Sequence, residues 1–372
     1  MTTIAVIGLG AMGLGIAQVY ATAGFAVLAT DASDRARTAA PKRLAEALAL
    51  RVSAGKMTPA EQEAILGRLS VVPALAGLAT ADLAIEAIIE SKDAKTALLL
   101  QLEHVLSPRA VLATNTSSLG VGDLGLPLVH PERLVGLHFF NPPTAMRLVE
   151  LISHPKTDPT AAALARQVTE AAGKTVIACP DSPGFVVNRC ARPYYGEALA
   201  LLEEGRSAAD IDGAMLAAGY RLGPFALIDL IGSDINLAAT EVIYHALDRH
   251  PRYFPFAALR RQVQSGHLGR KSGRGFLHPH PANPAPPDAK AIVLRIESAL
   301  VNEAAWLLAS GGPPPQDIDA AIRHGLNFPR GPFEMLEFHG RESIRRTLTD
   351  LAQSAPPHLV GRYDLGPMLQ AE

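Results

Sequence analysis

The sequence predicts an α/β fold in which an N-terminal doubly wound sheet is followed by two all-α helical domains related by duplication. Strand-like and helix-like stretches alternate from residue 1 to about residue 180, whereas the chain has a helical pattern from Asp181 onward. The helical part also repeats one ordered set of short motifs. At 372 residues the chain exceeds one ordinary core, so two or three domains are expected.

The N-terminus has the layout strand, glycine turn, helix, strand and acid. The apolar run 2–7 breaks into the motif GLGAMG at 8–13, and Asp31 closes a second apolar run. This layout seats a dinucleotide in a Rossmann-type sheet. Asp31 can accept a hydrogen bond from a ribose hydroxyl, and its charge would repel a 2′-phosphate. NAD is therefore favoured over NADP, although Arg35 and Arg37 lie close enough to leave NADP open.

Each glycine of this motif has its own physical reason. Gly8 permits the tight turn, Gly10 lets the backbone reach the pyrophosphate, and Gly13 lets the helix close on the strand. The start of that helix offers unpaired N–H groups and a positive dipole end to the phosphates. A glycine turn without a ligand is the alternative interpretation, and the acid in register argues against it.

Further short buried runs complete the predicted sheet, which places a dinucleotide-binding domain over residues 1–182. Between the second and third strands, the long segment 34–68 is expected to form two helices. The capping box Thr58-Pro59-Ala60-Glu61 opens the second of them. The further strands are expected at 69–72, 83–89, 110–114, 134–140, 147–152 and 175–179.

The helical part is expected to hold two related domains. Residues 183–278 form the first, a Pro-rich linker follows over 279–289, and residues 290–372 form a second, degenerate copy. We expect the copies to dock like two subunits of a dimer within one chain, which leaves a homodimer of whole chains open. Three motif pairs at offsets of 106, 107 and 108 positions carry the repeat: Glu197-Ala198-Leu199 with Glu303-Ala304-Ala305, Asp210-Ile211-Asp212 with Asp317-Ile318-Asp319, and Gly223-Pro224-Phe225 with Gly331-Pro332-Phe333.

Composition argues against several classes of protein. A net charge of −2 without a basic run argues against nucleic-acid binding, and no apolar run reaches the ~18 residues of a membrane helix. The only cysteines, Cys179 and Cys190, form no CxxC pattern, which favours a reducing, cytoplasmic location and no structural zinc. His278 and His280 in the linker leave a metal site open, but a solvated loop is favoured, so no metal is expected.

His138 and Glu150 are the candidate catalytic pair. His138 ends the expected strand 134–140, at the sheet edge where active sites of open α/β sheets lie, and Glu150 lies inside the next strand. A carboxylate in an apolar strand needs a partner, and a neighbouring imidazole would gain a fixed tautomer from it. The alternative is a core histidine with Glu150 at an edge that faces water.

Two further polar positions strengthen this interpretation. Ser117 lies in Asn115-Thr116-Ser117-Ser118, which ends a strand-like run at the same sheet edge, although turn chemistry alone can explain such residues. Asn188 follows Asp181 into the first long helix, where it could also be a cap. Its counterpart in the second copy is Leu294, which suggests that only the first copy is functional and that the second supports it.

On these residues the chain resembles the L-3-hydroxyacyl-CoA dehydrogenase family, of the 3-hydroxybutyryl-CoA dehydrogenase kind, with the helical domain duplicated. The resemblance covers nearly the whole chain. Besides the glycine turn with Asp31, the motifs that carry it are Glu86-Ala87-Ile88-Ile89-Glu90, Asn115-Thr116-Ser117-Ser118, His138-Phe139-Phe140-Asn141-Pro142 with Glu150, Pro183-Gly184-Phe185 with Asn188-Arg189, and Gly269-Arg270-Lys271-Ser272-Gly273-Arg274-Gly275-Phe276.

The resemblance implies a role for each site residue. His138 is the catalytic base with Glu150 as its orienting partner, and Ser117 and Asn188 hydrogen-bond the reacting oxygen and the acyl group. Arg51 and Lys56 are weak candidates for the CoA nucleotide, because Ala47 replaces an expected serine and lysines are sparse there. The residues expected to hold NAD are Gly8, Gly10, Met12, Gly13, Asp31, Glu90, Lys95, Asn115, Asn141 and Lys271.

The implied activity is NAD-dependent oxidation of L-3-hydroxyacyl-CoA to 3-ketoacyl-CoA, or the reverse reduction, as in fatty-acid β-oxidation, with an acyl-CoA thioester as the partner. A dehydrogenase of the same scaffold that acts on a free hydroxy acid, such as gulonate or carnitine, is the main alternative. A 3-hydroxyisobutyrate-type enzyme is disfavoured, because Gly184 stands where its lysine would precede Asn188. A non-catalytic NAD-binding protein is a remote alternative.

Overall fold

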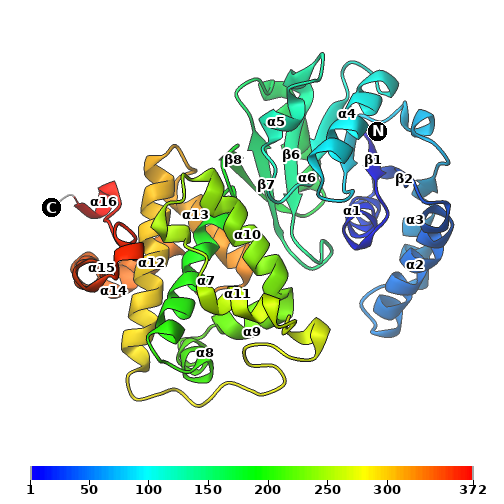
Figure 1. Ribbon diagram of the computed structural model, residues 1–372. Helices are drawn as coiled ribbons and strands as arrows, with labels where there is room; N and C mark the ends of the chain where they lie inside the picture. The colour runs from blue at the N-terminus through cyan, green and yellow to red at the C-terminus, as the bar shows by residue number, and fades with distance from the viewer. Residues whose placement is uncertain (1, 371–372) are drawn as a thin grey trace. The chain divides into compact units, whose positions relative to one another are not determined.

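The computed structural model describes residues 2–370, which divide into two compact units, one ending at Ser182 and the other beginning at Pro183. The first unit is an α/β domain built on one sheet, and the second is helical (Figure 1). The expected order of an α/β domain followed by a helical part is therefore confirmed. Within residues 2–370, no helix combines the length and apolar character that crossing a membrane requires.

The sheet of the first unit has eight strands in the order β3-β2-β1-β4-β5-β6-β7-β8. All neighbouring strands are parallel except β6 and β7, which are antiparallel. The strands are β1 Thr3–Ile7, β2 Ala26–Thr30, β3 Leu69–Val71, β4 Leu83–Glu86, β5 Val111–Thr114, β6 Leu134–Phe139, β7 Leu148–Ser153 and β8 Thr175–Pro180.

The main departure from the predicted strands is β4, which ends at Glu86 instead of continuing through residue 89. Its two neighbours end at the same level, because Ile7 of β1 and Thr114 of β5 both pair with Glu86. Without a strand on either side, the apolar residues that follow cannot extend the ladder. They form a loop that leads to Glu90.

Helices cover the sheet and form the excursion after β2. The capping box of α3 is confirmed: Thr58 Oγ1 accepts a hydrogen bond from the Glu61 N–H at 3.2 Å, and the Glu61 carboxylate accepts from the Thr58 N–H at 2.7 Å. The helices of this unit are α1 Ala11–Thr22, α2 Asp34–Ser53, α3 Pro59–Leu66, α4 Lys92–Val105, α5 Val121–Gly125 and α6 Pro159–Ala171, with 3₁₀ turns at Leu75–Leu78 and Pro131–Arg133.

The second unit has two runs of helices separated by an irregular segment between residues 273 and 288. The first run contains α7 Val187–Glu203, α8 Ala208–Ala217, α9 Pro224–Ile231, α10 Ser233–Ala246 and α11 Ala257–Gln264. The second contains α12 Ala289–Ala309, α13 Pro315–Leu326, α14 Pro332–His339, α15 Arg341–Ser354 and α16 Pro367–Gln370. Short 3₁₀ turns lie at Pro251–Tyr253, Arg270–Ser272 and Pro357–Leu359.

The two runs share local detail. Asp212 accepts the Phe225 N–H at the start of α9 at 2.9 Å, and Asp319 accepts the Phe333 N–H at the start of α14 at 2.8 Å. A Cβ at Gly223 would lie 2.2 Å from Asp212, and one at Gly331 would lie 2.3 Å from Asp319. Both aspartates therefore need the glycine that precedes each helix. These parallels support the predicted duplication, which remains a prediction.

The helices α7 and α12 pack along each other (Figure 1). Buried charge pairs join them. Arg189 Nε on α7 donates to Glu303 on α12 at 2.7 Å, and Arg295 Nε on α12 donates to Glu197 on α7 at 3.0 Å. In the first pair α7 supplies the arginine and α12 the glutamate, and in the second pair the two helices exchange these roles. Such reciprocity is the property of an isologous, two-fold interface.

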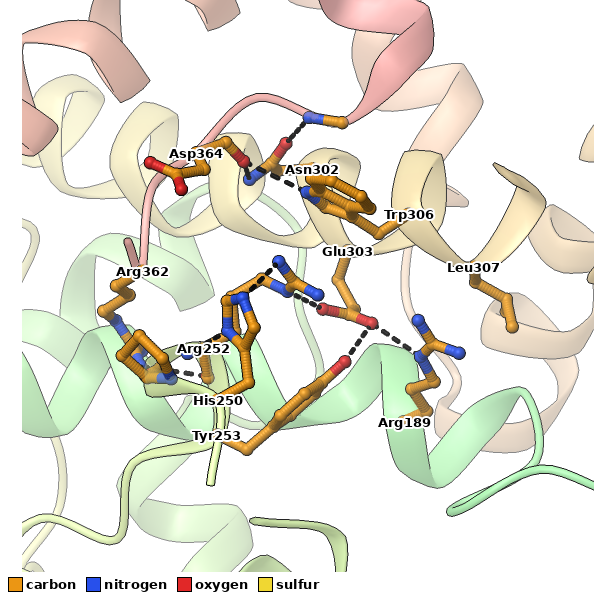
Figure 2. Close-up of polar contacts among 12 residues, drawn as sticks. Arg189, His250, Arg252, Tyr253, Asn302, Glu303, Trp306, Leu307, Arg362 and Asp364 are labelled. Atoms are coloured by element: carbon orange, nitrogen blue, oxygen red, sulfur yellow. Dashed lines mark hydrogen bonds and ion pairs between the residues drawn. The ribbon is translucent and has the colours of Figure 1, made fainter. Parts of the chain in front are cut away.

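The same reciprocity extends to the loops beside the helices. Figure 2 shows Glu303 reaching Arg252 and Tyr253, whose Nε and hydroxyl donate to its carboxylate at 3.0 and 2.5 Å. On the other side, Arg362 Nε and the Tyr363 hydroxyl donate to Glu197 at 2.7 and 3.1 Å. Both carboxylates are completely buried, so these donors compensate charges that water cannot reach.

Candidate active site

His138 and Glu150 face each other across the antiparallel strands β6 and β7. The two residues are directly opposite in the strand register, which places their side chains on the same face of the sheet. His138 Nδ1 lies 2.7 Å from Glu150 Oε2. The Glu150 side chain is fully buried and that of His138 is 7% exposed.

This geometry fixes the chemistry of the imidazole. An ionised carboxylate can only accept, so Nδ1 carries the proton and Nε2 becomes the nitrogen that exchanges protons with a reacting group. Burial of Glu150 strengthens the interaction, because little water screens it. The arrangement suits a general acid–base catalyst at the carboxyl end of β6.

Glu90 organises the loop that carries Ser117. Its Oε1 accepts hydrogen bonds from the Thr116 hydroxyl at 2.7 Å and from the N–H groups of Ser117 and Ser118 at 2.9 and 3.1 Å. Burial acts to raise the pKa of Glu90, but these donors and the Lys95 charge lower it below its ordinary value. The Ser117 hydroxyl also lies 3.3 Å from Glu90, so an ionised Glu90 holds this loop.

Lys95 is buried, and its side-chain nitrogen lies beside the Glu90 carboxylate. Its Nζ donates to both carboxylate oxygens of Glu86 at 2.9 Å and lies 3.4 Å from Glu90. The side chain is 1% exposed. A contact between Lys95 and NAD therefore stays a prediction, while its observed role is to connect the end of β4 to the Glu90 loop. Sequence reasoning missed Glu86 and Thr116, although both lie within motifs that it quotes.

The glycine turn fits a dinucleotide. A Cβ at Gly13 would lie 1.7 Å from the Gly8 carbonyl oxygen, and one at Gly8 would lie 2.6 Å from the Ala87 carbonyl oxygen. A Cβ at Gly10, in contrast, would meet no atom within 4 Å. Helix α1 also begins without a capping side chain or an acidic residue in its first turn. The N–H groups at this end are thus arranged for an anion such as the pyrophosphate of NAD.

Asp31 lies at the carboxyl end of β2, against this turn. Its carboxylate accepts the N–H groups of Leu9 at 2.7 Å and of Ser33 at 2.8 Å. Arg37 donates to the Asp31 carbonyl oxygen and pairs with Asp34 at 2.6 Å. One of the arginines that left NADP open is therefore already engaged with protein oxygens.

The other predicted positions of the first unit differ in exposure. Asn115 Oδ1 accepts the Phe139 N–H at 2.8 Å, which ties the ends of β5 and β6 together. Met12 is half-buried on α1, and Asn141 is exposed just after β6. Arg51 in the last turn of α2 and Lys56 in the following turn are both exposed.

Two predicted site residues belong to the second unit. Asn188 is the second residue of α7, and its carbonyl accepts a hydrogen bond from Arg192 Nε at 3.0 Å. Lys271 Nζ donates to Asp234 at 2.7 Å. Within the described part of the chain, residues 2–370, no group of three His, Cys, Asp or Glu side chains is arranged to hold a metal ion.

Comparison with known families decides what this scaffold is. The model of the "3-hydroxyacyl-CoA dehydrogenase, NAD binding domain" matches residues 3–182. The model of the "3-hydroxyacyl-CoA dehydrogenase, C-terminal domain" matches residues 184–278 and 292–369. The chain belongs to the 3-hydroxyacyl-CoA dehydrogenase family. The resemblance in the sequence and the NAD cofactor are thereby confirmed, and the chain is a member of a family of oxidoreductases.

Relatives within the family cover the chain to different extents. The 3-hydroxyadipyl-CoA dehydrogenase of Escherichia coli K12 is 42% identical over 275 residues, which are 73% of this chain and 58% of that protein. The 3-hydroxybutyryl-CoA dehydrogenase of Mycobacterium tuberculosis is 38% identical over 277 residues, 73% of this chain and 96% of that protein. The crystal structure of 3-hydroxybutyryl-CoA dehydrogenase from Escherichia coli K12 has a TM-score of 0.91 at 31% identity and covers 99% of this chain and 97% of its own.

Proposed function

We propose that the protein catalyses NAD-dependent oxidation of an L-3-hydroxyacyl-CoA to the 3-ketoacyl-CoA, or the reverse reduction. The observation that carries the proposal is the buried hydrogen bond between His138 and Glu150, 2.7 Å long at the end of β6. Membership of the family supports the proposal, because its relatives are named for 3-hydroxyacyl-CoA substrates.

Bound NAD would supply the nicotinamide C4 that accepts a hydride. In the oxidation, the C3–H bond of the substrate breaks, and His138 Nε2 takes the hydroxyl proton as the ketone forms. The Glu150 carboxylate stabilises the resulting imidazolium, which returns the proton in the reduction. A positioned general base contributes about 10²–10⁴ in rate.

Ser117 and Asn188 complete the proposed assignment as donors to the reacting oxygen and the acyl group. The hydrogen bonds from the Ser117 loop to Glu90 support the first role, since they hold the loop at the end of β5. Fixed donors of this kind stabilise charge that changes on the oxygen during the reaction. Asn188 belongs to the second unit, where it lies in the first turn of α7.

Steady-state oxidation of NADH tests this function directly. The assay compares 3-ketoacyl-CoAs of rising chain length, with NADPH in place of NADH as the control. We expect turnover with at least one thioester and with NADH well above NADPH. Absence of NADH oxidation with every thioester would refute the proposed activity.

The alternative of a free hydroxy acid as substrate rests on a specific departure in α2. Ala47 and the exposed residues Arg51 and Lys56 give this segment few cations for a CoA nucleotide. Turnover of a 3-keto acid without CoA, at a rate comparable to its thioester, would favour this alternative. Loss of activity when the thioester is hydrolysed would favour the acyl-CoA.

We also propose that the two helical copies form a pseudo-dimer within one chain. The reciprocal pairs Arg189–Glu303 and Arg295–Glu197 support this proposal. The match of one domain model to residues 184–278 and again to 292–369 supports the duplication that it requires. This proposal leaves open whether whole chains also associate into a homodimer, which a measurement of the molecular mass in solution decides.

The cytoplasmic location remains part of the proposal. Cys179 and Cys190 are both buried and neither belongs to a disulfide in the described part of the chain, which fits a reducing compartment. Burial raises the pKa of the Cys179 thiol, with further increases from the charges of Glu150 and Asp181, so this cysteine is kept protonated and unreactive.

A further inference from the structure

The loop between β6 and β7 joins the two strands that carry His138 and Glu150. It runs over residues 140–147 and contains Asn141, one of the residues expected to hold NAD. Among these eight residues only Pro143 is buried. The loop therefore has almost no apolar core of its own, and other contacts must fix its conformation.

Lys174, in the turn between α6 and β8, supplies one of these contacts. Its Nζ donates to the carbonyl oxygens of Pro143 at 2.5 Å and of Met146 at 2.8 Å. The residue is half-buried, and within residues 2–370 no carboxylate forms an ion pair with its ammonium group. Burial lowers the pKa of Lys174. The protein thus partly buries a charge without a counter-charge, and the groups that this charge binds belong to the loop.

A second contact joins the loop to α1, the helix whose first turn is arranged for the pyrophosphate. Pro143 lies against Gly15 of this helix, because a Cβ at Gly15 would lie 3.0 Å from Pro143 Cδ and 3.1 Å from its Cγ. The same proline therefore contacts the dinucleotide-binding helix with its ring and Lys174 with its carbonyl oxygen. Asn141, two residues earlier in the chain, stays exposed.

We propose that Lys174 is a positioning residue for the cofactor, which holds the loop so that Asn141 meets the nicotinamide end of NAD. The inference rests on the proposed function, because hydride transfer beside His138 requires the nicotinamide near the end of β6, where Asn141 follows. An ammonium group suits this task, since it has three donors and can satisfy two carbonyl oxygens of one loop. A loop that is already fixed loses less conformational freedom when NAD binds, so loss of Lys174 should weaken the binding of NADH.

Titration of the protein with NADH in the absence of thioester, followed by NADH fluorescence, measures this binding directly. Lys174→Met removes both hydrogen bonds but keeps an unbranched side chain, and it should raise the Kd for NADH about tenfold. Lys174→Arg can still donate to two carbonyl oxygens and should keep the Kd within about threefold. In an Asn141→Ala background, Lys174→Met should raise the Kd less than about twofold, because the side chain through which it acts is already missing.

Arg166→Met is the matched control. Arg166 on α6 donates to the carbonyl oxygen of Val176 on β8 at 3.0 Å, so the variant removes a cation bound to a backbone carbonyl near Lys174 without touching the loop. It should leave the Kd for NADH within about twofold. Where Lys174→Met fails to give a cooperative melting transition, Gly15→Ala decides the question, because its methyl group displaces the loop and should raise the Kd several-fold.

An unchanged Kd in Lys174→Met, or in Gly15→Ala where that variant decides, overturns this inference but leaves the proposed function intact. An equal effect of Lys174→Met with and without the Asn141 side chain also overturns it, since Lys174 would then not act through Asn141. If the wild-type protein binds NADH but turns over no 3-ketoacyl-CoA, the proposed function is refuted, and the comparison of Kd values still decides the role of Lys174.

Discussion

Gly8, Gly10 and Gly13 belong to one motif but are glycines for different reasons. Gly8 and Gly13 cannot hold a Cβ because backbone oxygens of the protein occupy its place. Gly10 has an ordinary extended backbone and open space beside it, so the protein alone gives no reason for glycine there. The reason must be a group that approaches the backbone, such as the pyrophosphate of NAD.

We therefore predict that Gly10→Ala weakens NADH binding without harming the fold. The KM for NADH should rise about tenfold or more, because the methyl group occupies the space of the phosphates. The melting temperature should stay the same or rise slightly, since alanine reduces the freedom of the unfolded chain. Gly13→Ala is the contrasting variant and should lose the folded state. Unchanged NADH affinity in Gly10→Ala would contradict this account of the turn.

The pairing of His138 with Glu150 follows from residue type, since a carboxylate in an apolar strand needs a partner. The sequence also places His138 at the end of its strand. What it cannot provide is the register, because β7 could run in either direction after the loop at 140–147. Only the antiparallel ladder puts the two residues directly opposite each other.

At the scale of secondary-structure elements, the end of β4 shows why contacts are harder to predict than strands. The apolar character of residues 83–89 predicts a strand, but its length is set by β1 and β5, which end at Ile7 and Thr114. Lys95 on α4 points to the resulting edge, where Glu86 neutralises it. Spacing along the chain does not reveal such an inward-facing lysine, since lysines are mostly exposed.

The pairing of α7 with α12 is a second feature of this scale. Glu197 and Glu303 are recognisable as repeated motif positions, whereas the arginines that neutralise them come from the opposite run of helices. Local sequence patterns predict each helix, but they do not show which residues meet across the interface. The reciprocal pairs Arg189–Glu303 and Arg295–Glu197 become apparent only in three dimensions.

We predict that Glu197→Gln lowers the free energy of unfolding by about 3–5 kcal/mol at pH 7, because it leaves buried guanidinium groups without their counter-charge. Burial alone would raise the pKa of Glu197, but Arg362 and Arg295 bring it below its ordinary value of 4.5. The stabilisation is therefore complete above the ordinary pKa and is lost as pH falls through the lower pKa of the folded state.

Urea unfolding of the wild-type protein and Glu197→Gln at a series of pH values checks this prediction. The difference between them should be largest above about pH 5 and should shrink in more acidic solution. Glu63→Gln, which changes an exposed glutamate on α3, should give no such pH-dependent difference and serves as the control. A difference that is small at pH 7, or that grows as pH falls, would contradict the charge-pair explanation.

At the scale of the whole molecule, α12 covers the face of α7 that carries Glu197. Two family relatives match 73% of this chain over 96% of their own length, so they are shorter than this chain. Without α12, the same face of this protein would expose buried apolar and charged side chains. An identical surface on a second molecule is the natural complement of an isologous interface.

We predict that a chain truncated after residue 288 forms a dimer through α7, whereas truncation within residues 367–370 leaves the association state unchanged. Size-exclusion chromatography with light scattering measures both. A folded, strictly monomeric protein after removal of α12 to α16 would contradict the pseudo-dimer proposal. The truncated chain could also aggregate. If a charge-reversing substitution on α7 relieves that aggregation, the exposed face of α7 is still the surface through which the chains associate.

The central claim is that His138, held by Glu150, transfers the proton of the substrate hydroxyl. Steady-state NADH oxidation by His138→Gln tests it most directly, together with NADH binding followed by fluorescence. We predict that kcat falls by about 10²–10⁴ while the affinity for NADH stays close to that of the wild type. Retention of more than about a tenth of the wild-type kcat would show that another group is the base.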